Sequence, residues 1–204
     1  MYRNDKQLDD EIRTLLAAGH ETTANALTWA CHLIAQHPEQ GEVICQEAAN
    51  ARPAALDSPQ HTPHLPNARA AILETLRLYP PIWLLLRKAA EDDSFLGLTI
   101  RRGTLCIVSP YLVHRRPGTW DRPDDFLPDR FMGDVDRIEK FGYLPFGAGP
   151  RRCVGEHFAI QEAEIVLSLL LKRYRLESAS PPTVPAAAIT LRPATPVLLK
   201  LVRR

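Results

Sequence analysis

Hydrophobic residues near the start of the chain recur at every third or fourth position, which is the spacing of one face of an α-helix. The apolar or small residues on this face are Leu8, Ile12, Leu15, Gly19, Ala26, Ala30 and Leu33. Pro38 interrupts the pattern, because proline cannot continue a helix. The pattern therefore predicts a helix over Leu8–His37, about 45 Å long and able to cross a whole domain.

The rest of the pattern predicts shorter elements separated by prolines. A second helix is expected over Ala68–Tyr79, and Pro80 and Pro81 end it, because a residue before proline is pushed out of the helical region. A last helix is expected over Glu156–Tyr174. Short extended runs predict strands at Trp83–Ala89, Leu98–Ile100 and Thr104–Ser109, and a terminal hairpin of Ile189–Leu191 with Val197–Val202.

Two stretches lack this periodicity. Residues 50–67 carry four prolines among polar residues, which is typical of an irregular surface connection. Residues 110–150 are rich in Pro, Gly, Asp and Arg, and an ordered meander of that length is uncommon unless it serves a function. Neither stretch marks a domain boundary, so we expect one mainly α-helical domain with small β-sheets.

Composition narrows the function classes. The chain has 204 residues, 45% of them hydrophobic and 24% charged, with a net charge of +1, so it offers no field that would recruit nucleic acid or an anionic membrane. Its apolar runs, such as Pro80–Leu86, are far too short to span a bilayer. The scattered cysteines, without a CxxC pair or a secretory leader, argue against a disulfide framework and predict a reducing cytoplasm.

The stretch FGAGPRRCVG, residues 146–155, surrounds Cys153 with glycines and arginines just before the last helix. The first N–H groups of that helix, together with Arg151 and Arg152, favour a thiolate at Cys153. Three glycines remove side chains where a flat partner would approach, and they are Gly147, Gly149 and Gly155. The alternative is that Cys153 is a small buried residue and the glycines only form a turn.

Five positions of this stretch fit the pattern F-x-x-G-x-R-x-C-x-G, and they are Phe146, Gly149, Arg151, Cys153 and Gly155. The spacing resembles the haem-thiolate loop of the cytochrome P450 family. The resemblance implies that Cys153 is the proximal ligand of the haem iron, and such a thiolate pushes electron density toward O–O cleavage. It also implies that Arg151 pairs with a haem propionate, that Phe146 packs beside the sulfur and that the loop glycines, Gly147 among them, border the cofactor.

The predicted first helix contains AGHETT, residues 18–23, which resembles the oxygen-binding segment A-G-x-[DE]-T-T of the same family. The resemblance implies that Ala18 and Gly19 border the haem. It further implies that Thr22 organises water near bound dioxygen and that Glu21 helps to deliver protons. The residues alone leave a structural alternative open, in which Gly19 eases helix crossing and Thr22 bonds back to its own helix.

A zinc site is the other chemistry that this segment suggests. His20 and Glu21 begin what could be an HExxH motif, but Ala24 occupies its fifth position. Without a second histidine one turn on, the helix cannot supply paired zinc ligands. We therefore interpret His20 as a polar residue beside the groove that Gly19 and Thr22 are expected to form in the apolar face of this helix.

A further pair of motifs concerns Glu74 and Arg77, which are three residues apart in the predicted second helix and can form an ion pair. Such a pair is often only a solvated surface contact. However, its position ahead of FLPDRF, residues 126–131, and of the cysteine loop resembles the order of motifs in the cytochrome P450 family. The resemblance implies a buried, structural triad of Glu74, Arg77 and Arg130, with Asp129 at a position where glutamate is commoner.

Three weaker expectations follow from the resemblance. Arg87 stands where many family members place a second propionate partner, although an ordinary surface arginine is the alternative. His114 aligns with a histidine that is frequent in the family, and we expect it to be a hydrogen-bonded structural residue. The positions that match the substrate pocket are Trp83, Leu84, Ile189 and Thr190.

The resemblance covers essentially the whole chain but only about half the usual length of the family. It implies a single partial domain over residues 1–204, the C-terminal portion of the cytochrome P450 fold, with the N-terminal half absent. The elements expected of this portion are the long oxygen-binding helix, the ExxR helix, the meander, the cysteine loop, the final helix and the terminal β-hairpin.

The implied activity is monooxygenation, with haem b as cofactor and with O₂ and a small apolar compound as substrates. Electrons would come from NAD(P)H only indirectly, through a ferredoxin or flavoprotein reductase that docks near Arg151, Arg152 and Lys140. Two alternatives stay open. The chain would be a truncated, non-catalytic remnant or interaction fragment that cannot retain haem alone, or it would keep haem and use peroxide or rearrange an oxygenated substrate.

Overall fold

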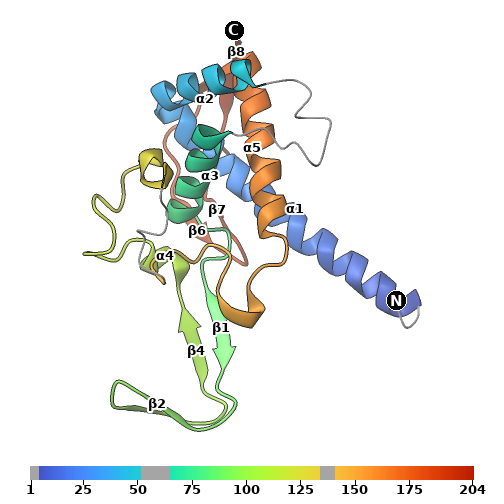
Figure 1. Cartoon of the computed structure of the whole chain (residues 1–204), viewed down its shortest axis with the longest axis vertical. Coiled ribbons are helices and arrows are strands. Elements are labelled where there is room, and N and C mark those ends of the chain that lie inside the picture. Colours follow the sequence, from blue (N-terminus) through green and yellow to red (C-terminus); the bar gives the residue numbers. More distant parts are fainter. Residues whose placement is uncertain (1–4, 52–64, 134–140) are drawn as a thin grey trace.

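The computed structural model describes residues 5–51, 65–133 and 141–204 (Figure 1). Its helices are α1 (Asp5–Gln36), α2 (Pro38–Asn50), α3 (Pro66–Leu78), the single turn α4 (Pro110–Val113) and α5 (Glu156–Arg173). Short 3₁₀ turns lie at Pro128–Phe131 and Gly149–Arg151. The predicted first, second and last helices are therefore confirmed to within a few residues. Among the described residues, no helix combines the length and apolar character needed to cross a membrane.

The described strands form four two-stranded antiparallel sheets. The pairs are β1 (Leu85–Lys88) with β4 (Leu105–Val108), β2 (Asp93–Phe95) with β3 (Leu98–Ile100), β5 (Tyr174–Ser178) with β8 (Leu199–Arg203), and β6 (Pro185–Ala187) with β7 (Leu191–Pro193). The three strands expected after the second helix are confirmed, whereas β2, β5 and β6 were missed. In Figure 1, β1 and β4 run down from the helical body to β2 and β3.

The predicted terminal hairpin of 189–191 with 197–202 is wrong, because each of its strands pairs elsewhere. Leu191 lies opposite Ala187 in the β6–β7 pair. The last strand instead pairs with β5, the segment that leaves α5, over five residue pairs from Tyr174 with Arg203 to Ser178 with Leu199. This longer ladder buries Leu176, which a local hairpin would leave unpaired.

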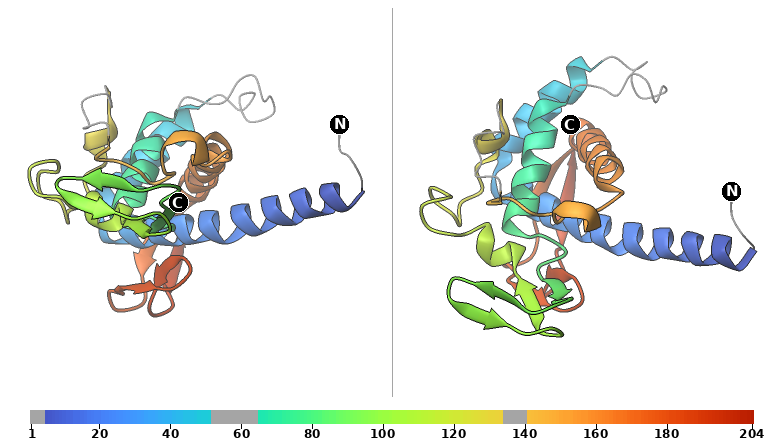
Figure 2. Two further views of the ribbon diagram at one scale, coloured as in Figure 1. Left: turned by 90° about the horizontal axis from the view of Figure 1, so that it is seen from below. Right: turned by 60° about the horizontal axis from the view of Figure 1, so that its bottom comes forward.

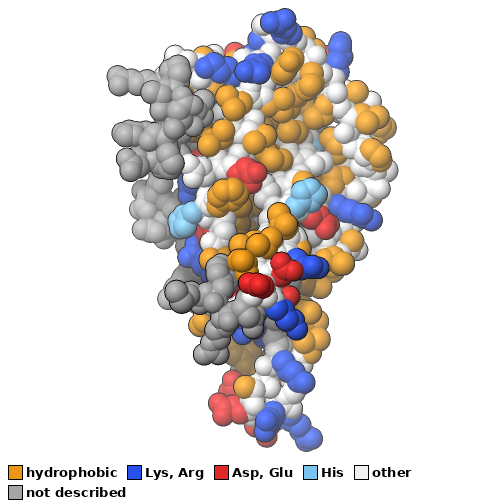
Figure 3. All heavy atoms as spheres, turned by 90° about the vertical axis from the view of Figure 1, so that its right-hand side faces the viewer, with side chains coloured by type: hydrophobic (Ala, Val, Ile, Leu, Met, Phe, Trp, Pro, Cys, Tyr) orange, Lys and Arg blue, Asp and Glu red, His pale blue; other side chains and the backbone are white. Residues whose placement is uncertain are grey.

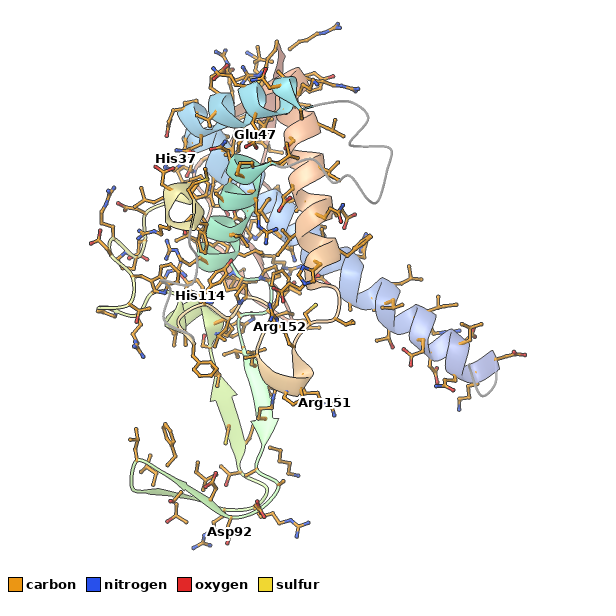
Figure 4. All side chains as sticks on the ribbon, viewed as in Figure 1. His37, Glu47, Asp92, His114, Arg151 and Arg152 are labelled. Carbon is orange, nitrogen blue, oxygen red and sulfur yellow. The ribbon has the colours of Figure 1, made fainter. Side chains whose placement is uncertain are left out.

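Helix α2 was also missed, because Pro38 was interpreted only as the end of a helix. In the structure Pro38 is the first residue of α2, a position where proline is tolerated because its missing N–H would have no helical partner. The carboxylate of Glu47 on α2 then accepts hydrogen bonds from the backbone N–H groups of Asn67 and Ala68, at 2.8 and 3.0 Å. Glu47, labelled in Figure 4, thus satisfies first-turn donors of α3 and fixes where that helix begins.

The core lies between the C-terminal half of α1 and helices α2, α3 and α5. Its apolar side chains include Ala30 and Leu33 of α1, Ile72 of α3 and Leu167 of α5. The apolar face predicted for α1 is therefore buried only in its second half. Every described residue from position 5 to position 21 is exposed, and Figure 2 shows this part of α1 projecting from the body. On the face toward which α1 projects, hydrophobic side chains are spread among charged ones (Figure 3).

Candidate active site

The centre of the candidate site is an ion pair that is closed to solvent. The side chains of Glu74 and Arg77, one turn apart on α3, are both 0% exposed. Arg77 donates through Nε to Oε2 of Glu74 at 2.7 Å and through one terminal nitrogen to Oε1 at 2.9 Å. A bidentate pair of this kind is shorter and stronger than a neutral hydrogen bond. The pair is thus a buried one and not the solvated surface contact that the sequence left as an alternative.

The remaining donors of Arg77 hold the meander by its backbone. They reach the carbonyl oxygens of His114 at 2.9 Å, Pro123 at 2.6 Å and Asp125 at 3.0 Å. Together with the two bonds to Glu74, these contacts use all five N–H groups that a guanidinium offers. The Arg77 guanidinium also lies 5.0 Å from the centre of the Trp120 ring. The meander therefore folds around one arginine whose N–H donors are all in hydrogen bonds.

Glu74 completes this arrangement from the acceptor side. Its Oε1 accepts a hydrogen bond from the backbone N–H of Leu127 at 2.9 Å and one from Nε of Arg130 at 3.3 Å. Arg130 also donates to the carbonyl oxygen of Arg122 at 2.7 Å. The structure thus brings Glu74, Arg77 and Arg130 together, as the resemblance implied.

His114 connects the ion pair to the cysteine loop. Its Nε2 accepts a hydrogen bond from the backbone N–H of Leu144 at 2.7 Å, so Nδ1 carries the ring proton and donates to the carbonyl oxygen of Arg77 at 3.0 Å. Tyr143 donates its hydroxyl to the carbonyl oxygen of Leu73 at 2.8 Å, and burial raises the pKa of that hydroxyl well above its usual value. The expectation of a hydrogen-bonded structural histidine is confirmed, and Figure 4 shows His114 beside the lower end of α3.

We predict that His114 makes the fold acid-sensitive. Burial, helped by the guanidinium groups of Arg77 and Arg115, lowers the pKa of His114 to about 3. Since the unfolded chain binds this proton at about pH 6.5, the stability due to neutral His114 is complete above that pH and is lost as the pH falls toward the folded pKa. At about pH 5 the expected loss is about 2 kcal/mol, measured as the free energy of unfolding in urea.

The variant His114→Asn should show a flatter pH profile than the wild type, because it has no ring to protonate. The matched control is His157→Asn, since His157 is exposed on α5. The control should keep the wild-type slope between about pH 7 and about pH 5. Equal slopes for the wild type and His114→Asn would contradict the prediction.

Backbone hydrogen bonds close the cysteine loop, and the first of them involves Leu144, the residue that His114 binds. Leu144, held by His114, accepts from the backbone N–H of Gly147 at 3.1 Å, and Phe146 accepts from the backbone N–H of Cys153 at 3.0 Å. Gly147 and Gly149 both have a φ of +73°, a conformation that residues with a Cβ avoid. The glycines therefore allow the chain to return to Phe146 and place Cys153 directly before α5.

The side chains of the loop are open to a ligand. Cys153 is exposed, and a Cβ at Gly149 would meet no atom within 4 Å. A Cβ at Gly147 would lie 3.8 Å from Leu85, so β1, which carries Arg87, begins beside the loop. An exposed thiol beside a glycine with open space around it suits a flat cofactor held by sulfur, so these residues fit a haem.

The two arginines of the loop differ in their partners. Arg152 forms a bidentate pair with Glu156 in the first turn of α5, at 2.6 and 2.5 Å. Arg151 makes no ion pair with any residue in the described part of the chain. Both lie at the loop below the start of α5 in Figure 4, and Lys140 falls outside the described residues. Arg151 is thus the loop cation whose charge stays available for an anionic group.

The predicted oxygen-binding segment lies on α1, where the exposed half of the helix meets the buried half. Thr22 donates its hydroxyl to the carbonyl oxygen of Ala18 at 2.7 Å, which is the local bond that the sequence left open as an alternative. A Cβ at Gly19 would meet nothing within 4 Å, so this part of the helix has no close neighbour. Glu21 is bound by a residue far away in sequence, because Oγ1 of Thr190 donates to its Oε1 at 2.6 Å. No pattern in the sequence indicates this contact.

The predicted substrate-side residues point in different directions. Trp83 donates from Nε1 to the carbonyl oxygen of Ala188 at 2.9 Å, which joins it to the loop between β6 and β7. In that loop Ile189 is 92% exposed and Thr190 is only 4% exposed. Leu84 is half-buried, and Arg87 is exposed and donates to the carbonyl oxygen of Leu86 at 2.9 Å.

One family model and several curated proteins match the chain. The family model, Cytochrome P450, matches residues 3–201. The chain is 36% identical to "Cytochrome P450 97B2, chloroplastic" of Glycine max over 85% of this chain and 36% of that protein. It is 33% identical to "Cyclooctat-9-en-7-ol 5-monooxygenase" of Streptomyces melanosporofaciens over 85% of this chain and 38% of that protein. It is 31% identical to "Cytochrome P450 4V2" of Homo sapiens over 98% of this chain and 39% of that protein. The chain thus spans 36–39% of the length of these relatives.

Proposed function

The chain belongs to the cytochrome P450 family, and from this membership we propose that it is the haem-holding, C-terminal portion of a monooxygenase. The single observation that carries the proposal is the cysteine loop. It presents an exposed thiol, has open space at Gly149 and is anchored through Leu144 and His114 to the buried ion pair of α3. A loop held this firmly keeps the sulfur of Cys153 in one place.

The proposed roles of the residues follow from where they lie. Cys153 would bind the haem iron as a thiolate. Phe146, which packs against the core and against a second buried group that includes Trp120 and Phe131, would fix the loop beside the sulfur. Arg151 would pair with a propionate, because its charge has no described counterion, and Arg87 on neighbouring β1 is the second candidate. Gly147, Gly149 and Gly155 would leave room for the flat ring.

The proton-handling residues would come from α1. When bound, haem would supply the oxidising chemistry that places one atom of O₂ into an apolar compound and releases the other as water. Glu21 would move protons through its carboxylate, and Thr22 would order water through its hydroxyl oxygen. That oxygen keeps acceptor capacity while its hydrogen points to Ala18, and the surface next to Gly19 is open.

The partners proposed are those of a reductase-driven enzyme. Electrons would come from a separate ferredoxin or flavoprotein reductase that docks on the cysteine-loop side of the molecule, near Arg151 and Arg152. The name of the Streptomyces melanosporofaciens relative says that it is a monooxygenase, which supports the reaction class. A non-catalytic fragment that cannot retain haem alone is the second candidate, because the exposed half of α1 leaves Leu15 and Leu16 uncovered.

Haem uptake by the isolated chain separates these two functions. If the proposal is correct, titration with haemin should saturate at one haem per chain, and the reduced, CO-treated protein should show the red-shifted Soret band of a thiolate site. No uptake, or unsaturable uptake without that band, would favour the non-catalytic fragment. The measurement needs only absorbance spectra.

A further inference from the structure

The face of α1 that carries Glu21 is hydrogen-bonded to the β6–β7 hairpin, in its loop and at the start of β7, from three positions four residues apart. Thr190 donates through Oγ1 to Oε1 of Glu21 at 2.6 Å, and Nδ2 of Asn25 donates to Oγ1 of Thr190 at 3.0 Å. One turn further on, Nε1 of Trp29 donates to the carbonyl oxygen of Leu191 at 3.3 Å. Residues four apart lie on one helical face, so this stripe fastens the loop along α1.

The direction of the Thr190 hydroxyl is fixed by its two partners. The oxygen accepts from the Asn25 amide, so its single hydrogen points to Oε1 of Glu21. Because Oε1 then accepts a hydrogen bond from Thr190, a proton carried by the carboxyl group sits on Oε2. The hydroxyl thus distinguishes the two carboxylate oxygens of Glu21.

The backbone of the loop is held from its other side as well. The N–H of Leu191 donates to the carbonyl oxygen of Pro81 at 2.9 Å, and Nε1 of Trp83 donates to that of Ala188 at 2.9 Å. Thr190 is therefore buried between α1 and the segment after α3, whereas its neighbour Ile189 is 92% exposed. An exposed glutamate side chain ordinarily samples several rotamers, and a fixed hydroxyl at 2.6 Å removes that freedom.

We propose that Thr190 is a positioning residue for Glu21. It holds the carboxylate on the face of α1 next to Thr22, with Oε2 turned outward as the oxygen that carries the proton. The inference rests on the proposed function and deepens it, because Thr190 then acts on proton delivery through Glu21 and not only as a pocket residue. The same contact joins the carboxylate to the loop that presents Ile189.

The first test is a double-mutant cycle on the chain without haem. Thr190→Val and Glu21→Ala, made singly and together, should show a coupling of about three- to tenfold in the unfolding equilibrium constant. Thr190→Ser keeps the hydroxyl and should retain the coupling with Glu21→Ala. The matched control is Thr183→Val, since Thr183 lies just before β6 and hydrogen-bonds to Thr195. It should show no coupling to Glu21→Ala.

The second test separates positioning from a purely structural tie. In the haem-loaded protein with dioxygen as the only probe, re-oxidation of two reduced haems by one O₂ consumes two protons when the oxygen leaves as hydrogen peroxide. Thr190→Val should slow it about three- to tenfold and change its solvent deuterium isotope effect, because Glu21 is no longer oriented. Thr190→Ser should restore both values.

Two results would overturn the inference. One is a coupling below about twofold in the cycle, which would mean that the Thr190 to Glu21 bond carries no free energy. The other is normal haem uptake with an unchanged re-oxidation rate and isotope effect in Thr190→Val. A wild-type chain that takes up no haem contradicts the proposed function instead, so the two failures are distinguishable.

Discussion

Replacing Cys153 with serine should abolish the red-shifted Soret band of the reduced, CO-treated protein. A serine hydroxyl does not ionise near neutral pH, so it cannot supply the thiolate that defines this band. Because Cys153 is exposed and contributes nothing to the core, the variant should unfold at the same urea concentration as the wild type. Replacing a residue that only supports a metal ligand typically lowers activity about 10- to 100-fold. Cys153 would itself be the ligand, so we expect turnover to fall by more than about 100-fold.

The matched control is Cys45→Ser. Cys45 lies on α2, away from the loop, and its thiol is free and half-buried. This variant should keep the haem stoichiometry and the spectrum of the wild type. If Cys153→Ser retained the red-shifted band, the sulfur of another residue would be the ligand and the proposed site would be wrong.

The substitution Glu74→Gln should lower the free energy of unfolding by about 3–5 kcal/mol. The change is nearly isosteric but leaves the guanidinium of Arg77 buried without a counterion, and it also puts an amide donor where Leu127 and Arg130 now donate. Globular domains are stable by about 5–15 kcal/mol, so the loss would be a large part of the total. Urea unfolding followed by circular dichroism measures it.

Arg77→Lys tests the same site from the other partner. Lysine keeps the positive charge but offers three donors in place of five, so at least two of the five hydrogen bonds that Arg77 donates would be lost. We expect a destabilisation that approaches that of Glu74→Gln. The control is Glu177→Gln, which removes an exposed pair with Arg175 and should cost less than about 1 kcal/mol. Comparable effects of Glu74→Gln and Glu177→Gln would show that burial of the α3 pair adds nothing.

The sequence was informative where the signal is local. Periodicity was enough for α1, α3 and α5, and Pro38 shows its limit, because one proline can both end a helix and begin the next. The terminal hairpin failed for a related reason, since strand partners depend on ladders between segments far apart in the chain. Pairing of β8 with β5 depends on α5 having placed β5 beside it.

The candidate site likewise has features that the sequence indicates and features that it does not. Motif spacing pointed to the cysteine loop and to the ion pair of Glu74 and Arg77, because those features involve specific side chains at fixed separations. The three carbonyl acceptors of Arg77 and the bond between Thr190 and Glu21 left no trace in the pattern. Any residue supplies a carbonyl oxygen, and Thr190 is 169 positions from Glu21.

Because only the second half of α1 is buried, the free energy of local opening should rise along the AGHETT segment. Amides before position 18 belong to helical turns with no tertiary cover, so the free energy that opens them is small. From Asn25 onward the helix is hydrogen-bonded to the β6–β7 hairpin and then packs in the core, so opening there costs more free energy. Glu21 and Thr22 lie between the easily opened turns and the stable ones. A partner that covers the projecting turns would therefore raise the free energy of local opening at these two residues without contacting either side chain.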